Sequence, residues 1–149
     1  MPHFKMDKKT KILFWILLGL FALTITFFVV SSINELRGPA FPITAFFAIC
    51  FAIIGFVLLF RVSRRKFKIE KKLRIFLILT SASAAGIPVF AILHNLVYAL
   101  FILLFGENFW GNGDEAVFFI LAIIVCPIVF IVGVIGTLIL MYKNKTKKK

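Results

Sequence analysis

Four long stretches without a charged residue organise the chain. They cover residues 12–34, 38–60, 75–106 and 116–142, and the shortest of them has 23 residues. About 20 apolar residues in a helix cross the hydrocarbon core of a bilayer, so each stretch is long enough to span it once. A backbone facing lipid must satisfy its own hydrogen bonds, which makes helix the default. The pattern predicts an all-α membrane protein with four transmembrane helices in a bundle.

The charged residues lie between these stretches and are unequally distributed. The N-terminal segment 1–11, the connection 61–74 and the tail 143–149 hold 17 of the 18 Lys and Arg residues. The other connections hold Arg37 and four carboxylates. Because basic residues favour the cytoplasmic side, we expect cytoplasmic termini, a basic cytoplasmic loop and an acidic outer loop at 107–115. The cell membrane, plasma or inner, is the expected location.

Composition supports the same class of protein. Of the 149 residues, 62% are hydrophobic and 16% are charged, whereas soluble domains have about 45–50% and about 25%. A net charge of +12 would indicate nucleic acid only if the basic residues lay on a soluble domain. We therefore expect the lipid bilayer, and no nucleic acid, as a partner.

The basic connection is predicted to contact anionic lipid headgroups. Each Lys or Arg close to such a surface gains about 1 kcal/mol. The alternative is a solvated loop that only fixes the topology. The eight candidate residues are Arg61, Arg64, Arg65, Lys66, Lys68, Lys71, Lys72 and Arg74.

One polar cluster interrupts the third stretch. His94 and Tyr98 are four residues apart and share a helix face, with Asn95 displaced around it. The third stretch is longer than a bilayer needs, so we expect His94 near the outer surface and residues 96–105 beyond the core. Two interpretations stay open: an interfacial cluster that reaches water or headgroups, or a functional site that handles protons or faces a quinone.

Small residues at helical spacing predict where helices pack against one another. Proline residues in the last two stretches, Pro88 and Pro127, are expected to kink their helices. The predicted packing residues are Ala82 and Gly86 in the third stretch, and Gly133 and Thr137 in the fourth.

Candidate chemistry is sparse. The spans hold no Asp, Glu, Lys or Arg, and such residues mark proton and ion pathways. Cys50 and Cys126 lie outside any C-x-x-C motif and are expected to pack as small apolar residues. Three acids of the outer loop, Glu107, Asp114 and Glu115, have oxygen donors but no EF-hand spacing. We expect neither a metal nor a cofactor.

These observations favour a small polytopic membrane protein that acts as an accessory or interaction subunit of a membrane complex, without catalysis of its own. Its partner would be a larger membrane protein or further copies of this chain. The alternative is an oligomeric transport or pore-forming protein, holin-like or a small channel. A third hypothesis is an enzyme-like handler of quinone or lipid centred on His94.

Overall fold

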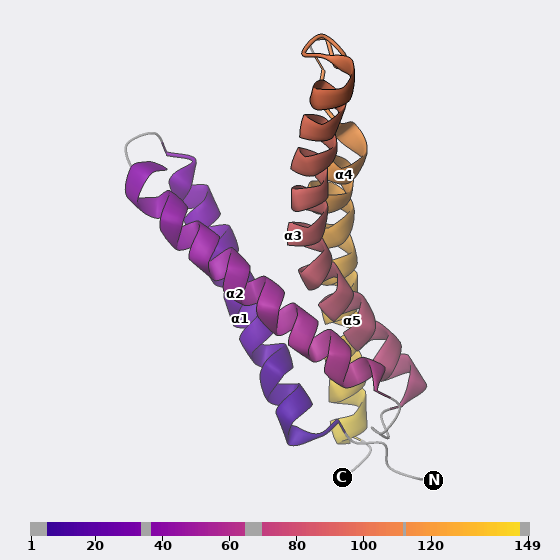
Figure 1. Cartoon of the computed structure of the whole chain (residues 1–149). Helices are drawn as coiled ribbons and strands as arrows, with labels where there is room; N and C mark the ends of the chain where they lie inside the picture. Colours follow the sequence, from indigo (N-terminus) through magenta and orange to yellow (C-terminus); the bar gives the residue numbers. More distant parts are fainter. Residues whose placement is uncertain (1–5, 34–36, 65–69, 112, 147–149) are drawn as a thin grey trace.

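The computed structural model describes residues 6–33, 37–64, 70–111 and 113–146, and those residues form helices and connecting loops (Figure 1). Four helical spans are long and apolar enough to cross a membrane, which confirms the expected number. The fourth span is made of three consecutive elements. The elements are α1 (Lys8–Ser31), α2 (Arg37–Ser63), α3 (Lys71–Phe105), α4 (Ala116–Ile120), the π-helical turn η2 (Leu121–Val125) and α5 (Cys126–Thr146).

Local signals explain where several of these helices begin and end. The first N–H groups of a helix lack partners within it, and an acidic side chain before the helix can accept them. Asp7 accepts from the Thr10 N–H at 3.3 Å at the start of α1. Glu115 accepts from the N–H groups of Val117 and Phe118 at the start of α4. Gly106 ends α3 with φ 92°, a conformation that favours glycine.

The helices form two hairpins that meet in a V (Figure 1). In the first, α1 packs against α2; in the second, α3 packs against α4, η2 and α5; α2 and α3 join the hairpins. The hairpins approach each other where α1 begins, α2 ends, α3 begins and α5 ends, and they diverge toward their loop ends (Figure 1). The helices therefore pack in chain order.

The shared core lies in the half of the molecule where the hairpins meet. Rings from three helices cross the junction: Phe130 lies 4.5 Å from Phe21 and 5.3 Å from Phe51, measured between ring centroids. The buried side chains that make up this core are Phe14, Leu17, Phe51, Leu58, Val62, Leu73, Leu77, Ala84, Phe130 and Val134. Toward the loop ends, each hairpin lacks this common core.

Glycines allow α2 and α5 to approach α3 closely. A Cβ atom on Gly55 of α2 would lie 2.9 Å from the Cβ atom of Ala84. A Cβ atom on Gly133 of α5 would lie 2.7 Å from the backbone nitrogen of Thr80. Both distances are shorter than van der Waals contact, so these two contacts depend on the missing side chain.

The last span contains a wide turn just before Pro127. The N–H of Cys126 donates to the carbonyl of Leu121, five residues earlier, which is the π-helical pattern. Pro127 has no N–H with which to continue the ordinary ladder. By contrast, α3 remains one helix across Pro88.

Candidate functional site at the loop end of α3 and α4

His94 is held between two carboxyl-bearing residues from the loop after α3. Its Nδ1 lies 2.7 Å from the carbonyl oxygen of Glu115 and 3.3 Å from the Glu115 carboxylate. Its Nε2 lies 3.4 Å from the Asp114 carboxylate. The His94 side chain is 15% exposed. Residues 21 positions apart in the sequence thus meet at one end of the second hairpin.

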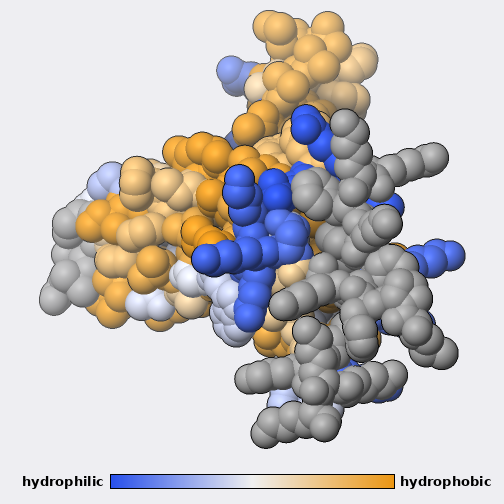
Figure 2. Space-filling model, turned by 90° about the horizontal axis from the view of Figure 1, so that it is seen from below, coloured by the Kyte–Doolittle hydropathy of each residue, from blue (hydrophilic) through white to orange (hydrophobic). Residues whose placement is uncertain are grey.

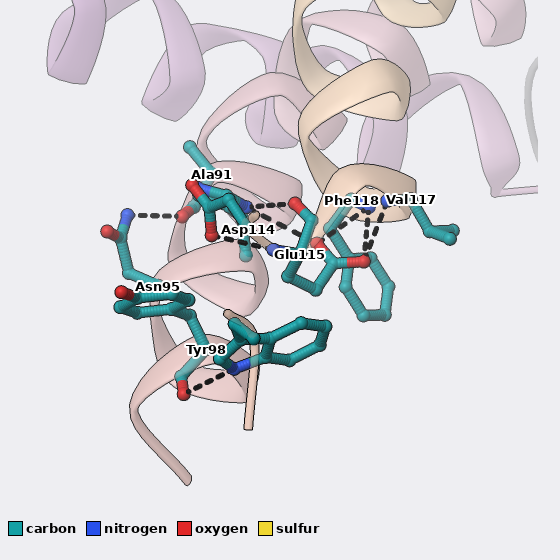
Figure 3. A network of polar contacts seen from close by, with 9 residues as sticks. Ala91, Asn95, Tyr98, Asp114, Glu115, Val117 and Phe118 are labelled. Carbon is teal, nitrogen blue, oxygen red and sulfur yellow. Dashed lines mark hydrogen bonds and ion pairs between the residues drawn. The ribbon is translucent and has the colours of Figure 1, made fainter. Parts of the chain in front are cut away.

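Glu115 performs two structural tasks in this network. Its carboxylate accepts the N–H of Val117 at 2.7 Å and that of Phe118 at 3.0 Å, and it also faces His94. Figure 3 shows Asp114 and Glu115 against α3, with Val117 and Phe118 at the start of the next helix. Glu115 is 6% exposed. It therefore caps α4 and fixes the start of that helix against α3.

The three predicted cluster residues point to different neighbours. Asn95 donates from Nδ2 to the carbonyl of Ala91 at 2.8 Å, within its own helix. The carbonyl of Tyr98 accepts from the indole N–H of Trp110 at 3.3 Å, and the two rings are stacked (Figure 3). Within the described ranges, no hydrogen bond joins His94 to Asn95 or Tyr98. The spacing placed His94 and Tyr98 on one helix face with Asn95 displaced around it, but each of the three has its own partner.

The geometry at His94 suits a structural tie better than a metal site. Its two nitrogens point away from each other, and each faces a different carboxylate, so no single point lies within reach of all three groups. Among the described residues, no group of three His, Cys, Asp or Glu side chains could hold a metal ion. The arrangement can anchor the loop to α3.

Beyond His94, α3 and the returning loop carry an aromatic cluster. The helix continues for 11 residues to Phe105, about 16 Å at 1.5 Å per residue. The Phe101 ring lies 5.1 Å from that of Phe109 and 5.5 Å from that of Trp110, measured between centroids. Of these side chains, Trp110 belongs to a residue type enriched at membrane–water interfaces.

A shallow groove lies on another face of α3. It has a volume of about 540 Å³ and is lined by Pro88, Ala91, Ile92, Asn95 and Leu96. These positions continue the face that packs against α2 at Ala84, because 84, 88, 91 and 95 are spaced four, three and four residues apart. Ala84 is buried, whereas Ala91 and Asn95 are exposed. The α2-binding face of α3 therefore extends beyond the part that α2 covers.

The predicted packing residues occupy unequal positions. Gly133 and Thr137 are buried, with Gly133 against Thr80 of α3. Gly86 is half-buried, and a Cβ atom there would lie 3.1 Å from the sulfur of Cys126. Ala82 is exposed, because it lies two residues from Ala84 and hence on nearly the opposite side of α3.

Two of the eight predicted lipid-contacting residues bind within the protein. Arg61 donates from Nη2 to the Asp7 carboxylate at 2.7 Å and from Nε to the Thr10 hydroxyl at 3.1 Å. Arg74 donates to the carbonyls of Val62 and Ser63, at 3.0 and 2.6 Å, at the end of α2. These contacts fasten α2 to α1 and to α3.

The rest of the basic set lies on the surface or outside the described ranges. Arg64, Lys71 and Lys72 are exposed, whereas positions 65, 66 and 68, which hold Arg65, Lys66 and Lys68, lie outside the described residues. Figure 2 views the molecule from the end where the hairpins meet and shows hydrophilic side chains gathered there between apolar flanks. Lipid contact by this set stays a prediction.

Sequence reasoning missed the role of Asp7. Burial raises the pKa of its carboxyl, but hydrogen bonds from Thr10 and Arg61 together lower it by more. The net pKa is therefore below the ordinary value. An Asp three residues before Thr, at the first turn of an apolar helix, is a capping signal that could have identified Asp7. Nothing in the sequence pointed to Arg61, which is 54 residues away.

The comparisons with known proteins add no family to this geometry. No protein-family model, no curated protein and no solved structure matches the chain. Its function therefore has to be inferred from its own features: uncharged spans, a loop tied down at His94, and an uncovered face of α3.

Proposed function

We propose that the protein is a multi-pass membrane protein that acts by binding other membrane helices, as an accessory or interaction subunit of a membrane complex without catalysis of its own. The observation that carries this proposal is the face of α3 that packs against α2 at Ala84 and continues, uncovered, along Ala91 and Asn95. A face already suited to receive one helix is suited to receive another.

Membrane physics makes this face more informative than exposed apolar residues in general. Lipid tails are as apolar as leucine, so helix association in a bilayer depends on close packing and polar contacts. The groove offers both, because Pro88 and Ala91 form a low floor and Asn95 supplies an amide. Ordinary lipid-facing surface needs neither feature.

The hydroxyl groups of the spans favour the interaction role over the alternative transport or pore-forming role. Most of them donate to carbonyls of their own helix and so have no need of a hydrated path. These are Thr24, Thr26, Thr44, Thr80, Ser81 and Ser83. Together with uncharged spans, this leaves few groups to stabilise an ion or a polar solute in transit.

The proposed orientation has both termini in the cytoplasm, and it rests on the distribution of basic residues. In a background with Cys50→Ala and Cys126→Ala, a cysteine replacing Asn108 is expected to react with an impermeant thiol reagent added to intact cells. A cysteine replacing Ser63 is expected to react only after permeabilisation. Reaction of the Ser63 variant in intact cells would reverse the orientation.

Photo-cross-linking in intact membranes tests the interaction role. A photoreactive residue at Ile92, which is 66% exposed beside the groove, is expected to form adducts with protein. Val117 is the matched control, because it is 64% exposed but lies on α4 and does not line the groove. Adducts with lipid alone at both positions would contradict the proposed function.

A further inference from the structure

We infer that the helix that fills the groove on α3 is α3 of a second copy of this chain, related by a two-fold axis that brings Asn95 next to Asn95 of the partner subunit. This inference rests on the proposed function and adds the identity of the bound helix. It follows from three properties of the face: its continuity with an existing helix contact, its self-complementary shape and its self-complementary hydrogen bonding.

The groove continues an interface that the chain already uses. Positions 77, 81, 84, 88, 91 and 95 repeat at four- and three-residue intervals, the spacing of helices packed side by side. Leu77, Ser81 and Ala84 are buried, and α2 reaches Ala84 through Gly55. Beyond this point the first hairpin diverges from α3 (Figure 1). The second half of the same seam is therefore free to receive a helix from outside the chain.

The shape of the face suits a copy of itself. Pro88, Ala91 and Asn95 form a trench, and Ile92 and Leu96, which are 66% and 58% exposed, form a ridge along one side of it. Helices pack by placing the ridge of one into the groove of the other. A two-fold axis makes this exchange reciprocal, since each copy supplies one ridge and one trench.

The hydrogen-bonding capacity of Asn95 is also self-complementary. A carboxamide has two N–H donors and one carbonyl acceptor. One N–H of Asn95 reaches the Ala91 carbonyl, and the structure of the described residues shows no partner for the carboxamide oxygen. Two such amides across a two-fold axis can each donate to the other. Polar side chains that bridge helices in this way stabilise association in membranes.

Charge does not oppose this arrangement at the seam. Asn95 lies 21 residues from Arg74, about 31 Å along the helix. The titratable groups near the seam on the same hairpin are His94, Asp114 and Glu115, and they contact one another. The seam itself therefore brings no basic residues of the two copies together.

Disulfide cross-linking of the full chain in native membranes tests the inference. The background carries Cys50→Ala and Cys126→Ala, and its thermal unfolding is compared with that of the wild type. Ala91→Cys places a thiol in the trench, and Val117→Cys places one on α4, next to Glu115 and outside the groove. Mild oxidation is expected to give a covalent dimer with Ala91→Cys and none with Val117→Cys.

The possible outcomes separate the inference from the proposed function. A covalent dimer from Ala91→Cys alone supports the inference. If Ala91→Cys forms adducts with a different protein and no dimer, the bound helix is not from a second copy, and the proposed function still stands. Equal dimer yields from both variants indicate random collision and overturn the inference. No protein adduct at either position, together with lipid-only photo-adducts at Ile92, overturns both proposals.

Substitution of Asn95 gives a second measurement that keeps both native cysteines. Asn95→Leu removes the amide while its own helix keeps its backbone hydrogen bonds, so the monomer is expected to fold normally. The dissociation constant of the dimer, measured by energy transfer between labelled copies in vesicles, is expected to rise roughly threefold to thirtyfold. Asn95→Gln is expected to retain part of the affinity. An unchanged dissociation constant for Asn95→Leu would overturn the pairing.

Discussion

Gly133 is the position at which one added methyl group best tests how α3 and α5 pack. A Cβ atom on Gly133 would lie 2.5 Å from the Thr80 hydroxyl oxygen, 2.7 Å from the Thr80 nitrogen and 3.0 Å from the Phe76 carbonyl oxygen. Favourable heavy-atom contacts lie at about 3.5–4.0 Å, so Gly133→Ala drives the methyl roughly 1 Å into the backbone of α3. Because a backbone cannot rotate away as a side chain can, we expect the two helices to separate.

The size of the effect follows from two opposing contributions. Overpacking costs about 1–3 kcal/mol, and a collision with backbone belongs near the upper end of this range. Replacing Gly by Ala within a helix contributes about 1 kcal/mol in the other direction. We therefore expect Gly133→Ala to lower the free energy of unfolding by about 2 kcal/mol.

Gly19 supplies the matched control, because a Cβ atom there would meet nothing within 4 Å. Gly19→Ala is expected to raise the free energy of unfolding by up to about 1 kcal/mol through helix propensity alone. Both variants and the wild type are unfolded reversibly with SDS in mixed micelles and followed by circular dichroism. If Gly133→Ala proves as stable as Gly19→Ala, the close approach of α3 and α5 is refuted.

Three further changes have defined outcomes. Asp7→Asn is expected to destabilise the protein at neutral pH. Because the folded-state pKa of Asp7 is lowered, the stability that its carboxylate contributes is present above the unfolded pKa and is lost as pH falls through the folded pKa. SDS unfolding of the wild type and the variant should therefore converge in acid. Thr137→Val is expected to raise the free energy of unfolding by about 1 kcal/mol, since the buried Thr137 hydroxyl has no hydrogen-bond partner among the described residues; equal or lower stability would contradict this. His94→Leu is expected to speed hydrogen exchange at the start of α4, because Glu115 loses a partner, while His94→Gln, which can still donate, should change it less; equal rates in both would contradict the anchoring role.

The number of helices long and apolar enough to cross a membrane could be predicted from the sequence, because it depends on where charged side chains fall. Charged side chains are excluded from the hydrocarbon core, so charge-free stretches mark the spans directly. The ends of the helices were harder to predict from the sequence. The first helix begins at Lys8, four residues before its charge-free stretch, because a capping residue and not the first apolar residue sets the start.

Contacts between helices could not be predicted in the same way. Lipid-facing and helix-facing surfaces of a span are both apolar, so small residues at i and i+4 do not reveal which face packs. The pair Ala82 and Gly86 illustrates this, because Ala82 is exposed while Ala84 is buried against α2. The partners of His94 and Arg61 depend on how hairpins fold back over 21 and 54 residues. Only the folded chain brings them together.

The π-helical turn Leu121–Val125 sets the rotational phase between the two halves of the last span. An ordinary α-helix advances 100° per residue, and a wide turn absorbs about one extra residue. On one side of it, Phe118 stacks on Phe90 of α3; on the other, Gly133 meets Thr80 of the same helix. Deleting one residue from the turn would leave an ordinary α-helical turn and keep both contact sets facing α3, whereas deleting one between the turn and Gly133 would rotate one set by about 100°. A bilayer tolerates small changes in span length, but this hairpin accommodates the loss of a residue at the turn and not elsewhere between the two contacts.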